Sequence, residues 1–251
     1  MKETTVITIK DVTLKNPIMI EGLPGVGHVG KLVAEHMVEE SGADKIIEIY
    51  SPHFPPQVLV MNDGTARLVR NEIYMDRKHN LLILVGDYQC ATSEGHYELA
   101  RIYLDIAKKY GVKRIYTLGG YGIGKLVDKP RVLGAVNKLE LVDEMKKYGV
   151  EFKENEPGGG IVGAAGLLLG MGALEDIEAI CLMGETSGYL VDPKSAQAVL
   201  SVLSKTLSMS IDMGALEERA KEMEKIVAKL QEMEKMQAGP ISLDADLSYI
   251  G

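Results

Sequence analysis

The sequence predicts an α/β protein built around a mixed sheet. Short apolar segments alternate with amphipathic segments over most of the 251 residues, which is the pattern of strands connected by helices. The chain also contains 27 glycines without a Gly-x-y repeat, and such glycines indicate the tight turns that these connections need. Both observations favour one large domain in which helices cross over a sheet.

Seven apolar segments have the length and composition of strands, and several are apolar enough to be buried on both faces of a sheet. Two further segments, residues 58–61 and 67–75, flank Asn62-Asp63-Gly64, a turn sequence that favours an antiparallel hairpin. A hairpin within a series of strand–helix units makes the predicted sheet mixed rather than wholly parallel. The seven segments are residues 6–9, 18–20, 46–49, 81–85, 115–118, 132–136 and 180–183.

Two helices are predicted between these strands, and each has a recognisable end. Residues 28–41 carry an apolar stripe and are followed by Gly42, while residues 94–110 end in basic residues and Gly111. Glycine tolerates the left-handed conformation that ends many helices, and basic side chains suit the negative end of the helix dipole. These residues therefore account for where both predicted helices end.

Two more helices are predicted in the last third of the chain. Residues 194–207 follow Asp192-Pro193, a pair that suits a first helical turn. Residues 216–236 consist almost wholly of Glu, Lys, Met and aliphatic residues with a narrow apolar seam. This seam could organise an oligomer, contact a partner or pack on its own subunit. Its members are Leu216, Met223, Val227 and Leu230.

The pattern divides the chain into three parts. Residues 1–208 form the predicted α/β core, residues 209–238 an amphipathic helical extension, and residues 239–251 a flexible acidic tail that begins with Gly239-Pro240. Within the core, Gly158-Gly159-Gly160 is either a flexible connection or a close approach of the backbone. The sequence leaves that choice open.

The segment EGLPGVGHVGK contains two overlapping motifs. Gly25, Gly27 and Gly30 match the GxGxxG of dinucleotide sites. Gly25, Gly30 and Lys31 also match the GxxxxGK of a P-loop, but Leu32 replaces the hydroxyl residue that would hold magnesium. The two motifs need different loop geometries, so we interpret the segment as a structural loop, with anion binding at the helix N-terminus as the alternative. Its glycines are Gly22, Gly25, Gly27 and Gly30.

Other reactive residues do not form a complete catalytic set. Asp87 and Cys90 follow the apolar segment 81–85, at a position where open sheets place ligand groups, but a thiol there is more often buried and inert. Thr186 and Ser187 could serve catalysis or cap a turn. We therefore predict no enzyme, no catalytic residues, no cofactor and no metal, and the scattered histidines make no ligand pair: His28, His36, His53, His79 and His96.

Composition restricts the partners and the compartment. The formal charge is −8, with 28 basic and 36 acidic residues and no basic cluster, which disfavours nucleic acid. The longest apolar stretches are shorter than the roughly 20 residues of a membrane span. Two distant cysteines, Cys90 and Cys181, without a CxxC pattern suit a reducing compartment. We expect a soluble, cytoplasmic protein without a nucleic-acid or membrane partner.

Four segments, taken together, carry a resemblance to a known family: residues 16–31 (NPIMIEGLPGVGHVGK), 117–120 (TLGG), 160–170 (GIVGAAGLLLG) and 185–196 (ETSGYLVDPKSA). In their order and spacing they resemble the proteasome assembly chaperone family, in particular its archaeal members related to the second subunit of the eukaryotic assembly-chaperone pair. The resemblance implies a three-layer α/β/α sandwich similar to phosphorylase and hydrolase folds, without their enzyme function, and binding to the α-ring of the proteasome core particle.

The C-terminal residues fit a docking tail. Family members use a terminal hydrophobic-Tyr-any motif that enters pockets between α subunits; here Tyr249 is antepenultimate and Ser248 precedes it, so the register differs from that motif. Apolar side chains on an acidic tail gain nothing in the free protein, whereas tyrosine and a terminal carboxylate suit capture by a partner; packing of the tail on its own core is the alternative. The predicted proteasome-binding residues are Leu247, Tyr249, Ile250 and Gly251.

These observations favour a non-enzymatic homo-oligomer that binds the α subunits of the proteasome core particle and assists its assembly or activation. Several tails on one oligomer would provide the avidity that a single short tail lacks. Two alternatives remain open at this point. One is a nucleotide- or nucleoside-handling enzyme that uses residues 22–31 and Asp87, and the other is an ATP-independent chaperone whose methionine-rich helix holds unfolded clients.

Overall fold

The computed structural model describes residues 1–154 and 158–237; at Glu224 and from residue 227 onward it describes the backbone alone. The strands are β1 (Thr5–Thr8), β2 (Ile18–Glu21), β3 (Asp44–Tyr50), β4 (Val58–Val60), β5 (Ala66–Leu68), β6 (Asn71–Asp76), β7 (Leu81–Gly86), β8 (Arg114–Gly122), β9 (Val132–Val136) and β10 (Glu178–Thr186). The helices are α1 (Val29–Ser41), preceded by a short 3₁₀ turn at Val26–His28, α2 (Ser93–Lys109), α3 (Glu140–Lys146), α4 (Ala164–Leu174), α5 (Pro193–Thr206) and α6 (Gly214–Gln237).

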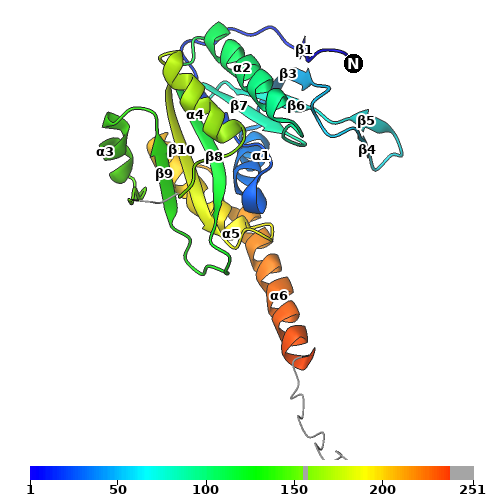
Figure 1. The fold of residues 1–251 in the computed structure, drawn as a ribbon, viewed down its shortest axis with the longest axis vertical. Coiled ribbons are helices and arrows are strands. Elements are labelled where there is room, and N and C mark those ends of the chain that lie inside the picture. The colour runs from blue at the N-terminus through cyan, green and yellow to red at the C-terminus, as the bar shows by residue number, and fades with distance from the viewer. Residues whose placement is uncertain (155–157, 238–251) are drawn as a thin grey trace, which may run out of the picture.

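Eight of the strands form one sheet in the order β1-β3-β6-β7-β2-β8-β10-β9 (Figure 1). The four central strands, β7, β2, β8 and β10, are parallel. The strands outside them are antiparallel to their neighbours. The prediction of a mixed sheet is confirmed.

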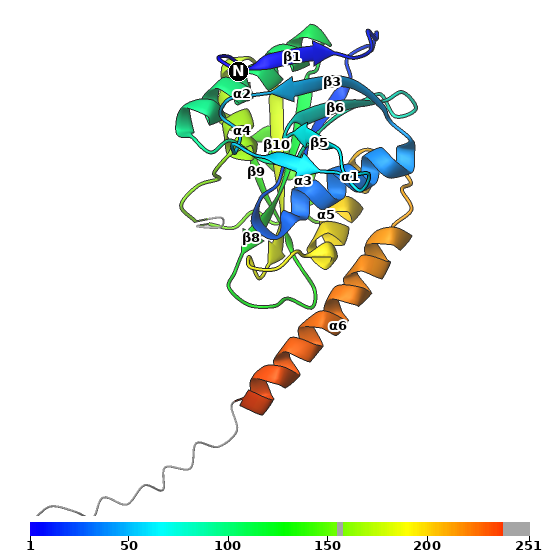
Figure 2. The ribbon, with the colours of Figure 1, turned by 90° about the vertical axis from the view of Figure 1, so that its right-hand side faces the viewer.

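Helices cover both faces of this sheet, which makes the three layers that the resemblance implied. Figure 2 shows α2 and α4 on one side of the sheet and α1 and α5 on the other. Successive residues of β2 separate accordingly, because side chains alternate across a strand. Met19 belongs to the core beneath α2 and α4, and Ile20 to the core beneath α1 and α5. The central strands are thus buried on both faces, as predicted.

The predicted helix ends are found where the sequence placed them. Gly42 ends α1 with a φ of 59°, and Lys108 and Lys109 occupy the last turn of α2. Asp192 caps α5 by accepting a hydrogen bond of 2.9 Å from the Ser195 amide. Of these signals, the Asp192 cap follows the carboxyl end of β10 and determines where α5 begins there.

The structure differs from the prediction in two places. The segment 67–75 is divided: β5 pairs with β4 in a separate two-stranded hairpin, and β6 enters the main sheet. The expected turn is present, with Gly64 at a φ of 82°. Helices α3 and α4 were not predicted; α4 is so uniformly apolar that no helical periodicity marks it.

Helix α6 projects away from the sheet and its covering helices (Figures 1 and 2). Its first turns are held against the body, since Leu216 is fully buried and Ala220 is nearly so. The segment before it is held by a 2.6 Å hydrogen bond between His36 Nε2 and the Asp212 carbonyl. The body therefore fixes the base of this helix.

Candidate functional site

The glycine loop lies at the carboxyl end of β2 and packs closely on its surroundings. A Cβ atom on Gly30 would approach the Leu118 carbonyl oxygen to 2.1 Å, and one on Gly22 would approach the Gly30 oxygen to 2.3 Å. Gly27 has a φ of 62° and leaves 2.8 Å between an added Cβ and Thr186 Oγ1, whereas a Cβ on Gly25 would meet only Gln89 Nε2, at an ordinary contact distance of 3.9 Å. Three of the four glycines thus allow α1 to begin against β8 and β10.

The charged residues of the supposed nucleotide site are bound to other parts of the chain. Lys31 Nζ lies 2.5 Å from Glu35 and 3.0 Å from the Gly86 carbonyl oxygen. Asp87 accepts two hydrogen bonds from Arg67, at 2.6 and 2.9 Å, and one from the Arg70 amide. Although burial opposes its ionisation, these bonds hold the pKa of Asp87 below its usual value. Both groups have structural partners here.

Cys90 has the surroundings of a structural thiol rather than of a nucleophile. Cys90 and His96 line the same small cavity, but burial raises the pKa of the Cys90 thiol to about 12, so it is not a thiolate nucleophile at neutral pH. Among the side chains that the structure describes, no group of three metal-binding residues occurs. The described part of the chain contains no helix long and apolar enough to cross a membrane.

The turn after β10 has structural bonds of its own. Glu185 is buried and forms an ion pair with Arg131, whose backbone amide also donates to it at 3.1 Å. The Arg131 hydrogen bond lowers the pKa of Glu185. Thr186 Oγ1 accepts from the Gly188 amide at 3.4 Å. Thr186 therefore caps the turn, and Ser187 is buried beside it.

One carboxyl group in this region lacks such a partner. Glu21 ends β2 and is 1% exposed; its Oε1 accepts from the Leu23 amide at 3.0 Å, while its Oε2 has no hydrogen-bond partner among the described residues. Burial raises the pKa of Glu21 to about 7, partly offset by the Leu23 and Leu118 amides. Glu21 lies on the wall of a cavity of about 460 Å³. No role was predicted for this residue from the sequence.

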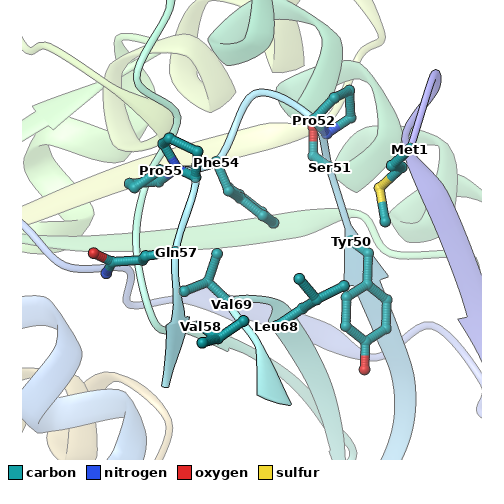
Figure 3. A pocket seen from close by; sticks show the side chains of 11 residues that line it. Met1, Tyr50, Ser51, Pro52, Phe54, Pro55, Gln57, Val58, Leu68 and Val69 are labelled. Carbon is teal, nitrogen blue, oxygen red and sulfur yellow. The ribbon is translucent and has the colours of Figure 1, made fainter. Parts of the chain in front are cut away.

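A second hollow, of about 650 Å³, lies near the N-terminus between β3 and the β4–β5 hairpin (Figure 3). Its labelled side chains are mainly apolar and include Phe54, Val58 and Leu68. Val58 and Leu68 are each about half exposed, at 52% and 50%. An uncharged wall of this kind suits contact with another apolar surface better than acid–base chemistry.

The structure describes the side chains of two of the four predicted seam residues of α6. Leu216 is buried against the core beneath α1 and α5, and Met223 is half-buried. The side chains of Val227 and Leu230 lie outside the described residues, as do Leu247, Tyr249, Ile250 and Gly251 of the tail. The N-terminal part of the seam therefore packs on its own subunit.

The chain is similar to known proteins over nearly its whole length. Residues 19–231 match the PAC2 family. The sequence is 44% identical over 250 residues to the uncharacterized protein MJ1210 of Methanocaldococcus jannaschii, covering 97% of this chain and 96% of that protein.

Two crystal structures from Pyrococcus furiosus have similar folds. PbaB, described as an archaeal proteasome activator, is 45% identical with a TM-score of 0.87, over 92% of this chain and 100% of that chain. PbaA, described as an archaeal homolog of proteasome-assembly chaperone, is 27% identical with a TM-score of 0.79, over 94% of each chain. These similarities cover the body and reach into α6.

Proposed function

Because the chain belongs to the PAC2 family, we propose that it is a non-enzymatic factor that binds the proteasome core particle and assists its assembly or activation. The observation that carries this proposal is the match to the archaeal proteasome activator PbaB at 45% identity over the whole of that chain. Such a factor would work in the cytoplasm, beside the core particle.

The proposed docking element is the end of the chain, which binds the α-ring. Tyr249 would supply the aromatic anchor, Leu247 and Ile250 apolar contacts, and Gly251 the terminal carboxylate. Support comes from the chemistry of these residues, because a tyrosine gives a large contact area at small entropic cost and a carboxylate suits capture by a cation. Helix α6 would carry this tail away from the body, since it projects from it (Figure 2).

We further propose a homo-oligomer that presents several tails at once. Linked tails bind with an avidity far above that of one tail, provided that their spacing matches the pockets. Two apolar surfaces could hold the copies together: the distal part of the α6 seam, and the hairpin side chains Val58, Val60 and Leu68, which are 50 to 74% exposed. Leu216 is already buried within its own subunit, so it is not available for this contact.

The tail can be tested by surface plasmon resonance with immobilised core particle from the same organism. Deletion of residues 249–251, or Tyr249→Ala, should weaken binding by about 30-fold or more per site, because a buried aromatic anchor is commonly worth at least about 2 kcal/mol. Residues appended after Gly251 should also weaken binding, because they displace the carboxylate. The melting temperature and the oligomer mass should not change.

Ser248→Ala is the matched control in this experiment. It changes a residue of the same tail without removing an apolar anchor or the carboxylate, so binding should stay within about twofold of the unaltered protein. If the deletion, Tyr249→Ala and the appended variant all bind like the unaltered chain, the folded body makes the contact and the tail hypothesis is wrong.

The enzyme alternative is less well supported. Lys31 and Asp87 are both engaged by neighbouring residues, and the P-loop hydroxyl is replaced by Leu32. The alternative predicts saturable turnover of nucleosides that Asp87→Ala abolishes. We expect no turnover in a direct assay by liquid chromatography.

A further inference from the structure

The cavity that contains Glu21 is separate from the proposed docking tail. It lies at the carboxyl ends of β2, β8 and β10, where open α/β sheets commonly bind small molecules. Its volume of about 460 Å³ falls within the roughly 300–1,000 Å³ of ligand pockets. Leu23, Ile161 and Met183 contribute apolar walls, and Val162, which is 90% exposed, stands at its rim.

The sheet beneath this cavity carries a row of polar side chains. Glu21 of β2 is the register partner of Thr117 of β8, and Thr117 is in turn the partner of Cys181 of β10. All three are buried, and residues in register on adjacent strands point to the same face. The row places one carboxyl, one hydroxyl and one thiol side by side. Neighbouring residues on the same face of these strands, such as Met19 and Ile115, are apolar.

The fold does not explain why Glu21 is buried with one oxygen unpaired. A buried polar atom is normally hydrogen-bonded, and leaving one without a partner costs about 1–3 kcal/mol. Oε2 of Glu21 has no such partner among the described residues, yet the side chain is 99% shielded and lines the cavity. The Oε2 atom is itself buried, so a donor inside the pocket would reach it after a rotation of the Glu21 side chain toward the cavity.

The remaining groups restrict the chemistry of that donor. No lysine or arginine is among the described side chains that line the cavity, so a phosphate or carboxylate would find no countercharge. Burial raises the pKa of the Cys181 thiol to about 12, which keeps it neutral. His96 and Tyr121 are the other ionisable lining groups. The cavity therefore offers one acidic group inside a largely apolar wall.

From this arrangement we propose that the cavity binds a small organic amine, whose ammonium group pairs with the free oxygen of Glu21 and whose apolar body contacts Leu23, Ile161 and Met183. A charge-assisted hydrogen bond in a low-dielectric site is stronger than a neutral one. The ion pair would give Glu21 Oε2 the partner that it lacks among the described residues. This site is independent of the proteasome contact, and either proposal can fail without the other.

Calorimetric titration of the full chain with benzylamine at pH 8 tests the proposal. Benzylamine should bind saturably at one site per chain. Benzyl alcohol, which has the same shape but no charge, and benzoate, which has the opposite charge, should each bind at least tenfold more weakly. No core particle is present, so the result does not depend on the proposed function.

Two variants separate a role in binding from a role in folding. Glu21→Gln removes the charge and should weaken benzylamine binding at least tenfold. Gly119→Val should weaken it similarly by filling the cavity, because Gly119 lines it and an added Cβ meets nothing closer than Met183 at 3.9 Å. Glu140→Gln, which removes an exposed carboxylate on α3, should leave binding unchanged.

The proposal is overturned by any of three results: no saturable binding of benzylamine at millimolar concentrations, equal binding of benzylamine and benzyl alcohol, or unchanged binding by folded Glu21→Gln. Circular dichroism and thermal melting establish that each variant is folded before titration. Binding that survives Gly119→Val but not Glu21→Gln would place the amine outside this cavity and would also refute the proposal.

Discussion

Two buried glutamates at the carboxyl ends of β2 and β10 behave in opposite ways. Glu21 and Glu185 are 1% and 5% exposed. Glu21 is the last residue of β2 and Glu185 the last but one of β10, and these two strands flank β8 on either side. The pKa of Glu21 is raised to about 7 by burial, whereas the Arg131 hydrogen bond lowers that of Glu185. Burial alone does not determine the charge of a carboxyl group; a cation within reach does. Glu185 therefore stabilises its turn through Arg131, whereas Glu21 keeps an oxygen without a partner among the described residues.

Arg131→Met should give the largest change in stability and would sharpen this contrast. It leaves Glu185 buried with only the backbone amide as donor, and breaking a buried pair from one side commonly costs about 3 kcal/mol or more. Because Arg131 is partly exposed at 30%, we expect a loss at the lower end, near about 3 kcal/mol, in urea unfolding at pH 7.

The pH dependence of this loss has a definite sign. The pKa of folded Glu185 is lowered from 4.5, so the pair stabilises the protein above that value and ceases to do so as the pH falls through the folded pKa. The difference between the unaltered chain and Arg131→Met should therefore shrink below pH 4. A loss under about 1 kcal/mol at pH 7 would contradict the assignment of Glu185 as a stabilising ion-pair partner.

Glu21→Gln should have a smaller effect in the opposite direction. The pKa of Glu21 rises from 4.5 to about 7 on folding, so the folded state binds the proton more tightly. Stability from this group is full below pH 4.5, falls as the pH rises to 7, and stays low above it. The rise from 4.5 to about 7 corresponds to about 3 kcal/mol at pH 8. The variant should recover about 2 kcal/mol of this, because the buried Gln amide still leaves a polar atom without a partner. It should also lose the pH step in equilibrium unfolding from pH 4 to 8.

If Glu21→Gln were less stable than the unaltered chain at pH 8, the contrast with Glu185 would be wrong, because the Glu21 carboxylate would then have a stabilising partner. The unfolding should be followed without added amines, since an ammonium ligand would restore part of the stability of the unaltered chain.

Lys153→Met should have the smallest effect. Lys153 lies 2.9 Å from Glu151 in a pair that is 53% and 37% exposed, and solvent screens such a pair. We expect a change within about 0.5 kcal/mol by urea unfolding. A larger loss would show that the exposed end of the Arg131 network contributes as much as its buried end.

The sequence predicted the elements whose causes are local. The caps at Gly42 and Asp192 and the turn at Gly64 follow from the chemistry of a few adjacent residues. Helix α4 was missed because its residues are apolar on every side, and α3 because it is short. The segment 67–75 was predicted as one strand, since nothing local indicates that β5 leaves the main sheet while β6 stays in it.

The candidate site likewise has features that adjacent residues determine and features that tertiary contacts determine. The structural use of Gly22 and Gly30 could be inferred from a strand–glycine–helix pattern. The close contacts of Gly22 are local, with Gly30 and Ala34 of α1, but the contact of Gly30 with Leu118 depends on β8, which lies far along the chain. Glu21 carried one usable signal: it is an acid that ends an apolar strand just before a glycine-rich loop. That signal does not distinguish it from Glu185, because the presence or absence of Arg131 is decided by tertiary structure.

The order of strands in the sheet also determines how the protein can be made. Strand β2 is synthesised early, yet its two neighbours, β7 and β8, pair Leu81 and Arg114 with Ile18. On the ribosome, both edges of this central strand stay open until most of the sheet has been translated. Contacts so distant in sequence slow folding and leave strand edges exposed to other chains. The nascent chain should therefore be prone to pair with other chains through these edges until β8 has been translated.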